Sequence, residues 1–411
     1  MKISIYIHIP FCVRKCLYCD FLSGPAPSAV RTLYIAALCK EIHLRSLEFD
    51  QSKDTVTSIF FGGGTPSSIS GKDIQTILST VKECFTLEKD CEISIEVNPG
   101  TEDLENKFRI YKEAGINRMS IGLQSANDEE LKILGRIHNT KDFIDTYNAA
   151  VSTGFKNLNV DLISGIPGQT VDRFEENLKF LLGLNPPPTH ISVYGLIIEE
   201  GTEFYRMYGT PEEPSADRDG DAPSEPVADR NVDSANPKPC LPSEEEERLM
   251  YRRTKSILEK EGYHRYEISN YALPGFECRH NCVYWKRGNY LGIGLGASGM
   301  INNVRYKNIS DMDLYLKVID DERLPYDEDE TEHLSKEDMM AEFMFLGLRM
   351  TEGVSVKEFE DTFLYRFPKE YEKAVNKYTG MGLLTKKDDR VMLTEDGIDV
   401  SNVIMSEFLF D

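Results

Sequence analysis

The sequence predicts a partial (β/α)6 barrel of the TIM-like kind, followed by a helical domain. Six apolar runs of strand length recur along the first half of the chain, and each is followed by a stretch with helical periodicity. Six such units in succession imply parallel strands joined by right-handed crossovers. Unusual polar, glycine and cysteine residues follow the runs, at the strand ends where parallel α/β folds bind ligands.

The six predicted strands are seven to nine residues long and rich in β-branched residues, at 3–9, 56–62, 92–98, 118–124, 157–165 and 190–197. The predicted helices lie between and after them, near 28–49, 71–85, 102–114, 127–135, 140–153 and 171–183. Asn127 with Glu130 has the spacing of a capping box, and so has Ser243 with Glu246 at the start of a later helix.

The domain organisation follows from changes in composition. The barrel is expected at 1–208, and a barrel extension at 244–309. An insertion is expected between them at 209–243, with seven of the nineteen prolines. Residues 209–247 hold twelve acidic and three basic side chains, so we expect the insertion to be mobile. A helical domain at 310–411 ends in a short hairpin of winged-helix type.

The composition excludes some classes of function. The chain has 411 residues and a formal net charge of -22, which argues against binding nucleic acid. The winged-helix-like end is therefore expected to pack or to act as a lid. No apolar run approaches the roughly 20 residues that span a membrane, and the start reads as a strand and not as a signal peptide. We expect a cytoplasmic protein, with membrane contact only through a partner.

Three of the nine cysteines form a C-x-x-x-C-x-x-C pattern directly after the first predicted strand. Thiolates favour iron–sulfur clusters, and Cys12, Cys16 and Cys19 together would hold three corners of a cubane. The fourth iron would remain open to a cofactor or a substrate. A zinc knuckle is the alternative, but it needs a fourth close ligand, and His8 is awkwardly placed on the strand.

The segment HIPFCVRKCLYCDF resembles the radical S-adenosylmethionine superfamily. The later motifs GGGTP, EVNPG, GLQS, DLISGIPGQT and YGL resemble one branch of it, the oxygen-independent coproporphyrinogen III oxidases and the related HemW heme chaperones. This resemblance implies a 4Fe-4S cluster on the three cysteines. It also implies S-adenosylmethionine on the open iron and a reductant such as flavodoxin or ferredoxin.

The resemblance also implies a set of contacts to the cofactor. Gly62, Gly63, Gly64 and Thr65 would let the backbone approach the methionine moiety, although a tight turn would explain them too. Glu96 could accept hydrogen bonds from a ribose or an ammonium group. The remaining matched positions are Tyr6, Tyr18, Gln124, Arg136, Asp161 and Gly195. Some of these residues could serve a second S-adenosylmethionine instead.

Three features favour the heme chaperones over the oxidases. The resemblance places a further cysteine of the oxidases two positions after the third cluster cysteine, where this chain has Phe21. The oxidases also carry a long N-terminal extension, whereas here the first predicted strand begins at Ile3. Residues 280–285 match H-N-x-x-Y-W, which marks the chaperones. We therefore expect a protein that binds heme, with His280 as a contact, and delivers it to an acceptor hemoprotein. The alternative is oxidative decarboxylation of coproporphyrinogen III to protoporphyrinogen IX.

The heme contact itself has competing interpretations. Imidazole is the commonest axial ligand of heme iron, which favours His280. Cys278 and Cys282 bracket this histidine, so thiolate ligation is also open. A purely structural loop, in which His280 bonds to the backbone and Trp285 fills the core, is the third interpretation.

Overall fold

A computed structural model describes residues 1–209 and 239–409. Among these residues, twelve strands form one sheet in the order β12-β11-β10-β9-β1-β2-β3-β4-β5-β6-β8-β7. The predicted acidic insertion falls largely on 210–238, outside the described residues. No helix of the described part is long and apolar enough to cross a membrane.

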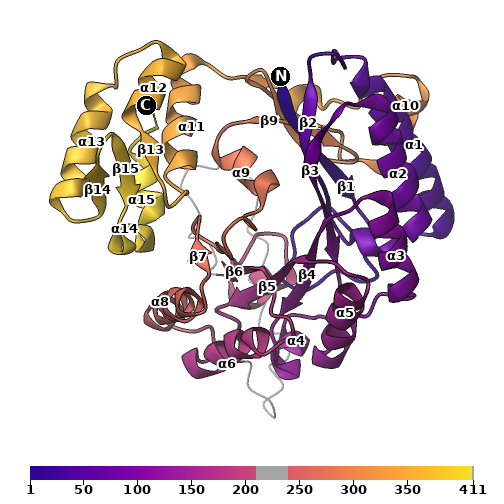
Figure 1. The fold of residues 1–411 in the computed structure, drawn as a ribbon, viewed down its shortest axis with the longest axis horizontal. Helices are drawn as coiled ribbons and strands as arrows, with labels where there is room; N and C mark the ends of the chain where they lie inside the picture. Colours follow the sequence, from indigo (N-terminus) through magenta and orange to yellow (C-terminus); the bar gives the residue numbers. More distant parts are fainter. Residues whose placement is uncertain (210–238, 410–411) are drawn as a thin grey trace, which may run out of the picture.

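Six consecutive parallel strands form the centre of the sheet, which confirms the predicted partial barrel. They are β1 (Lys2–Ile9), β2 (Thr55–Gly63), β3 (Leu87–Val97), β4 (Arg118–Gln124), β5 (Asn157–Ser164) and β6 (His190–Gly195). The connecting helices are α1 (Ser28–Ser46), α2 (Gly71–Cys84), α3 (Leu104–Ala114), α4 (Asp128–Ile133), α5 (Thr140–Ser152) and α6 (Val171–Leu182). Figure 1 shows these helices along the outer side of the curved sheet.

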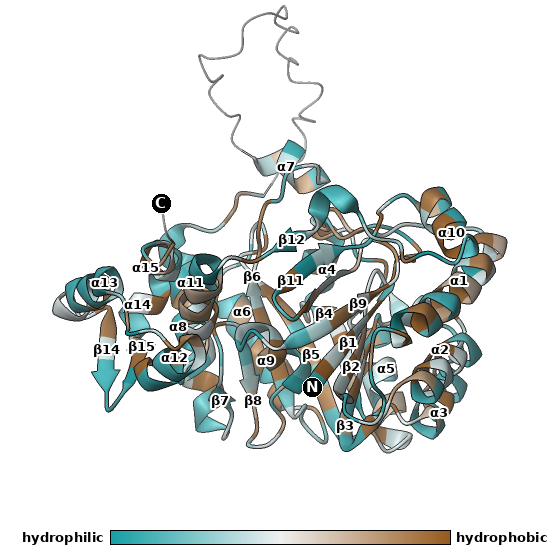
Figure 2. Cartoon of the chain, turned by 90° about the horizontal axis from the view of Figure 1, so that it is seen from above, coloured by the Kyte–Doolittle hydropathy of each residue, from teal (hydrophilic) through white to brown (hydrophobic). Residues whose placement is uncertain are grey.

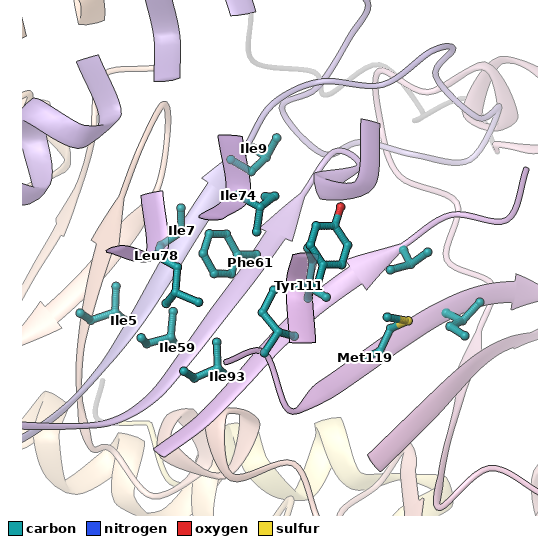
Figure 3. Close-up of a cluster of buried hydrophobic side chains, with 14 of the residues drawn as sticks. Ile5, Ile7, Ile9, Ile59, Phe61, Ile74, Leu78, Ile93, Tyr111 and Met119 are labelled. Carbon is teal, nitrogen blue, oxygen red and sulfur yellow. The ribbon is translucent and has the colours of Figure 1, made fainter. Parts of the chain in front are cut away.

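The main core lies between the sheet and this outer layer of helices. Ile5, Ile7 and Ile9 of β1 are completely buried beside Ile59 and Phe61 of β2. Figure 3 shows this row of side chains next to Ile74 and Leu78 of α2. Figure 2 shows hydrophilic residues on the outward surfaces of the helices. The apolar strands are therefore held by burial against amphipathic helices.

The two predicted capping boxes have different outcomes. Ser243 and Glu246 form a complete box at the start of α8 (Glu244–Lys260). Asn127 caps α4 through its side chain, but the predicted box there is wrong. The Glu130 carboxylate is buried and accepts hydrogen bonds from Ser125 Oγ (2.6 Å) and Gln169 Nε2 (2.8 Å) instead. The two hydrogen bonds to the buried Glu130 carboxylate replace the bond that it would make to the Asn127 backbone in a capping box.

A second set of elements covers the open sides of the barrel. It comprises α7 (Glu203–Tyr208), α8, β7 (His264–Arg265), β8 (Asn270–Ala272), α9 (Arg279–Trp285), β9 (Asn289–Ile293), β10 (Ser298–Ile301), β11 (Val304–Lys307), α10 (Met312–Asp320) and β12 (Glu332–His333). β9 extends the parallel sheet beside β1, and β8 pairs antiparallel with β6. The short helix α9 lies inside the curve of the sheet (Figure 1) and contacts β2 and β9.

The C-terminal region is helical and has its own core. It contains α11 (Lys336–Gly347), β13 (Val354–Ser355), α12 (Val356–Phe363), α13 (Lys369–Gly380), β14 (Leu384–Lys387), β15 (Arg390–Leu393), α14 (Glu395–Asp399) and α15 (Ser401–Ser406). β14 and β15 form the hairpin that the sequence predicts, and β13 completes a three-stranded sheet. Lys255 and Arg265 both bind the Glu395 carboxylate, which ties this region to α8 and β7.

Candidate functional site

The carboxyl ends of the six parallel strands bring most of the predicted site residues to one edge of the sheet. Ile9, three residues before Cys12, pairs with Gly63. Gly122 pairs with Asp161 on the neighbouring strand, two residues before Gln124. Gly195 is the last residue of β6, and an added Cβ there would meet no atom within 4 Å. These predicted residues therefore lie at or near the carboxyl ends of parallel strands along one edge of the sheet.

The cysteine loop is held by hydrogen bonds from its backbone. The N–H of Cys12 donates to the Gly24 carbonyl (3.0 Å), and Leu17 N–H donates to the Leu134 carbonyl (3.1 Å). Cys12 is buried, whereas Cys16 and Cys19 are partly exposed. Burial raises the pKa of the Cys19 thiol, and the nearby Cys16 raises it further. The loop that carries the three free thiols is therefore held in place by backbone hydrogen bonds.

The donor set of the cysteine loop fits an iron–sulfur cluster. Cys12, Cys16 and Cys19 are free cysteines and supply three soft thiolate donors, the ligand type that iron–sulfur clusters take. Three protein ligands for four irons would leave one iron open.

A chain of polar contacts connects the cysteine loop to two other strand ends. Thr65 Oγ1 lies 3.3 Å from Cys12 Sγ and accepts a hydrogen bond from Asn98 Nδ2 (2.8 Å). Arg136 Nη2 donates to Asn98 Oδ1 (3.0 Å), and Arg136 Nη1 donates to Cys16 Sγ (3.5 Å). Sequence reasoning missed Asn98, although it stands inside the EVNPG motif.

The glycines at the end of β2 are required by packing within the chain. Gly63 has a φ of +108°, and an added Cβ would lie 2.5 Å from the His8 ring. A Cβ on Gly64 would lie 2.9 Å from the Phe11 carbonyl oxygen, and one on Gly62 2.9 Å from the Tyr6 ring. These contacts agree with the tight-turn interpretation. The Gly63 N–H also bonds the Glu96 carboxylate.

Two carboxyl groups share the interior of the barrel. Asp161 accepts hydrogen bonds from Ser120 Oγ (2.9 Å) and Asn159 Nδ2 (2.8 Å). Glu96 lies near it on β3, and burial together with the Asp161 charge raises the pKa of Glu96 to about 8. Burial also raises the pKa of Asp161. Such a pair can accept hydrogen bonds from hydroxyl or ammonium groups of a ligand, which would relieve its desolvation.

The raised pKa of Glu96 predicts a pH-dependent effect of Glu96→Gln on stability. The folded state holds the proton up to about pH 8, above the ordinary pKa of 4.5. The native protein therefore loses stability as pH rises from 4.5 to 8. A tenfold change in the acid dissociation constant corresponds to about 1.4 kcal/mol. Since Glu96 keeps contact with solvent, we discount the total and expect the variant to gain about 2 kcal/mol over wild type above pH 8.

Urea unfolding at pH 5 and pH 8.5 checks this prediction. The exposed Glu113→Gln serves as the control, because the ion pair of Glu113 with Arg109 lies at the surface. An equal effect of Glu96→Gln at the two pH values would contradict the raised pKa.

Two predicted tyrosines lie at the cysteine loop, Tyr6 on β1 before it and Tyr18 within it. The Tyr6 hydroxyl is 3.0 Å from His8 Nδ1, and His8 Nε2 is 2.9 Å from the Leu22 carbonyl oxygen. Burial lowers the pKa of His8, so its ring is neutral and supports the loop. Burial raises the pKa of Tyr18, which lies among Arg136, Cys16 and Cys19. Both tyrosines thus adjoin the cysteine loop. Gln124 ends β4 with a left-handed φ of 71°.

His280 is buried in α9, with 1% of its surface exposed. Nδ1 lies 2.9 Å from Ser58 Oγ, and Nε2 lies 2.8 Å from the Tyr284 hydroxyl. Its backbone N–H donates to Glu92 (3.1 Å). Burial and the Arg118 charge lower the pKa of His280 to about 3. A metal ion could reach this ring only by displacing Ser58 or Tyr284.

A cavity of about 430 Å³ lies between the cysteine loop, β1 and α9. Its walls are formed by Tyr6, His8, Asp20, Phe21, Leu22, Tyr284, Tyr290, Gly296, Ala297 and Ser298. A larger cavity of about 1360 Å³ lies beside Met1 at the amino end of β1 and contains none of the predicted site residues. The smaller cavity is therefore the one next to the predicted chemistry.

Comparisons with known proteins identify the family of this chain. Residues 6–181 match the model of the radical SAM superfamily, and 334–400 match the HemN C-terminal domain. The heme chaperone HemW of Lactococcus lactis subsp. lactis (strain IL1403) is 34% identical, over 99% of this chain and 97% of that protein. HemW of Bacillus subtilis (strain 168) is 33% identical, over 99% of both.

A solved structure shows the same fold. Coproporphyrinogen III oxidase (HemN) from Escherichia coli, a radical SAM enzyme, has a TM-score of 0.80 and 23% identity, over 99% of this chain and 89% of that chain. The sequence relatives at 33% and 34% identity extend over the cysteine loop, the strand ends and the α9 motif alike. The chain belongs to the HemW family of the radical SAM superfamily.

Proposed function

We propose that this protein is a heme chaperone that binds heme and delivers it to an acceptor hemoprotein. The observation that carries the proposal is the H-N-x-x-Y-W helix α9, which lies inside the barrel beside the cavity behind the cysteine loop. Full-length similarity to proteins named heme chaperone HemW supports it. Phe21 on the cavity wall, in place of a fourth cysteine, supports it against the oxidase alternative.

Cys12, Cys16 and Cys19 would hold the 4Fe-4S cluster, which supplies an open iron for S-adenosylmethionine. Thr65 and Arg136 would support the cysteines through their contacts with Cys12 and Cys16. Around the cofactor, Glu96 and Asp161 would accept hydrogen bonds. Gly195 would offer backbone that no neighbouring side chain covers. The predicted contacts at Tyr6, Tyr18, Gly63, Gly64 and Gln124 complete this assignment, with flavodoxin or ferredoxin as the class of reductant.

A heme titration tests the proposal. Anaerobically reconstituted protein should bind ferric heme with a defined absorbance band and transfer it to an apo-hemoprotein. The same preparation should not convert coproporphyrinogen III to protoporphyrinogen IX with S-adenosylmethionine and a reductant. Anaerobic turnover of coproporphyrinogen III would overturn the chaperone assignment and favour the oxidase.

A further inference from the structure

Resting on the proposed heme binding, we infer that Tyr284 is the axial ligand of the heme iron and that His280 is the positioning residue behind it. The bound heme would occupy the cavity of about 430 Å³ between the cysteine loop and α9. In this assignment the tyrosine of the H-N-x-x-Y-W motif contacts the heme, and the histidine orients the tyrosine. The sequence instead predicts the histidine as the heme contact.

The positions of the two side chains carry this inference. Tyr284 lines the cavity and is half-buried, whereas His280 is 1% exposed and lines none of it. The His280 ring is held by Ser58 on Nδ1, by the Tyr284 hydroxyl on Nε2 and by stacking on Phe60 (5.2 Å, 29°). A ring that is held on both nitrogens cannot ligate iron without losing a buried hydrogen bond.

Aromatic and apolar side chains form part of the cavity wall. Tyr6, Tyr284 and Tyr290 contribute aromatic walls, and Tyr290 packs edge-on against Tyr284 (4.7 Å, 90°). Phe21 and Leu22 are 64% and 41% exposed, side by side, on the cysteine-loop wall of the cavity. Adjacent exposed apolar side chains at a concave site indicate a binding surface. Tyrosine is an established type of protein ligand to heme iron, so the donor fits this ligand class.

Ligation by Tyr284 exchanges the proton on its oxygen for the ferric iron, and no oxidation state changes. The Tyr284 O–H bond breaks as the bond from its oxygen to the ferric iron forms, and the proton leaves to water in the open cavity. His280 can then donate from Nε2, which lies 2.8 Å from the Tyr284 oxygen, while Nδ1 accepts from Ser58 Oγ at 2.9 Å. The Ser58 hydroxyl now donates to Ser4 Oγ (2.7 Å), and it can turn to make this exchange.

Titration of ferric heme into the reconstituted full-length chain tests the inference, with resonance Raman spectra read for bands of a coordinated phenolate. We expect Tyr284→Phe to lose these bands and to bind heme at least tenfold more weakly. His280→Gln should keep the bands, because the amide can still donate to the phenolate, with a weaker affinity. Tyr365→Phe, on an exposed tyrosine of the C-terminal region, should match wild type.

The outcomes separate this inference from the proposed function. Heme binding by wild type with unchanged bands in Tyr284→Phe would overturn the ligand assignment and leave the chaperone function standing. Loss of ligation in His280→Gln with full ligation in Tyr284→Phe would make His280 the ligand. No heme binding by folded wild type would overturn both. Circular dichroism and cluster absorbance confirm that each variant is folded and loaded.

Discussion

Replacing Cys12, Cys16 and Cys19 together by alanine should reduce the iron and sulfide content of reconstituted protein to background. A radical SAM cluster has only three protein ligands, so this change removes all of them. Iron and sulfide assays, with visible absorbance before and after reconstitution, measure the loss.

The barrel should survive this loss. The loop is anchored by backbone bonds from Cys12 to Gly24 and from Leu17 to Leu134, and Arg14 Nη2 donates to the Gly135 carbonyl (2.7 Å). We expect the free energy of unfolding of the cluster-free protein to change by about 1 kcal/mol, as for an ordinary substitution. Cys240→Ala, at an exposed cysteine, is the matched control and should keep the full cluster. Iron retained in the triple variant would contradict the ligand assignment.

Local patterns explain how much of this fold was predictable from the sequence. β4 begins and ends where its apolar run does, at Arg118 and Gln124, because the strand is buried on both faces. β3 was harder, because it begins at Leu87 with the polar residues of LEKD, five positions before its predicted start. Leu87 pairs with Val56 of β2, and this pairing extends the strand over those polar residues. A hydropathy pattern does not reveal a pairing between two distant segments.

Some site residues were likewise predictable from a local motif, and others were not. The three cysteines were found because a cluster loop is a short, contiguous motif. Asn98 was missed because its role depends on Thr65 and Arg136, which lie 33 and 38 positions away. The surroundings of His280 were equally hidden, since Ser58 approaches it from β2 across 222 positions. Motifs therefore locate the site, and long-range packing decides what each residue in it can do.

Long-range packing also decides the role of Glu41 and Arg45 of α1, where a substitution is expected to cause a large loss of stability. In sequence they look like an ordinary surface pair at i and i+4, yet neither side chain has any exposed surface. Glu41 accepts hydrogen bonds from Arg45 Nε (3.4 Å), Asn308 Nδ2 (2.7 Å), Tyr315 Oη (2.7 Å) and the Gly294 N–H (2.9 Å). The Arg45 guanidinium lies over both the Tyr306 and the Tyr326 ring, 4.5 and 4.2 Å from their centroids.

Arg45→Met should therefore destabilise the barrel by about 3 to 5 kcal/mol, because it leaves a buried carboxylate without its countercharge. Trp285 is the chain's only tryptophan and belongs to α9, so its fluorescence during urea unfolding follows the barrel. The control is Arg109→Met, which breaks an exposed i,i+4 pair with Glu113 and should cost less than about 1 kcal/mol. A loss below about 1 kcal/mol for Arg45→Met would contradict a buried charge at Glu41.

The effect of Arg45→Met should extend to the heme cavity. Glu41 holds the Gly294 N–H, and the Tyr34 hydroxyl accepts from the Leu295 N–H (3.0 Å) while donating to the His8 carbonyl (2.7 Å). The following residues, 296–298, line the cavity, and so does His8. Loosening this anchor should therefore weaken heme binding, although neither residue contacts the heme.

The double variant Glu41→Leu, Arg45→Met separates the two effects. It also removes the unpaired carboxylate, so it should recover part of the lost stability but should not restore the position of residues 294–298. Heme affinity that recovered together with stability would show that the anchor acts through folding alone.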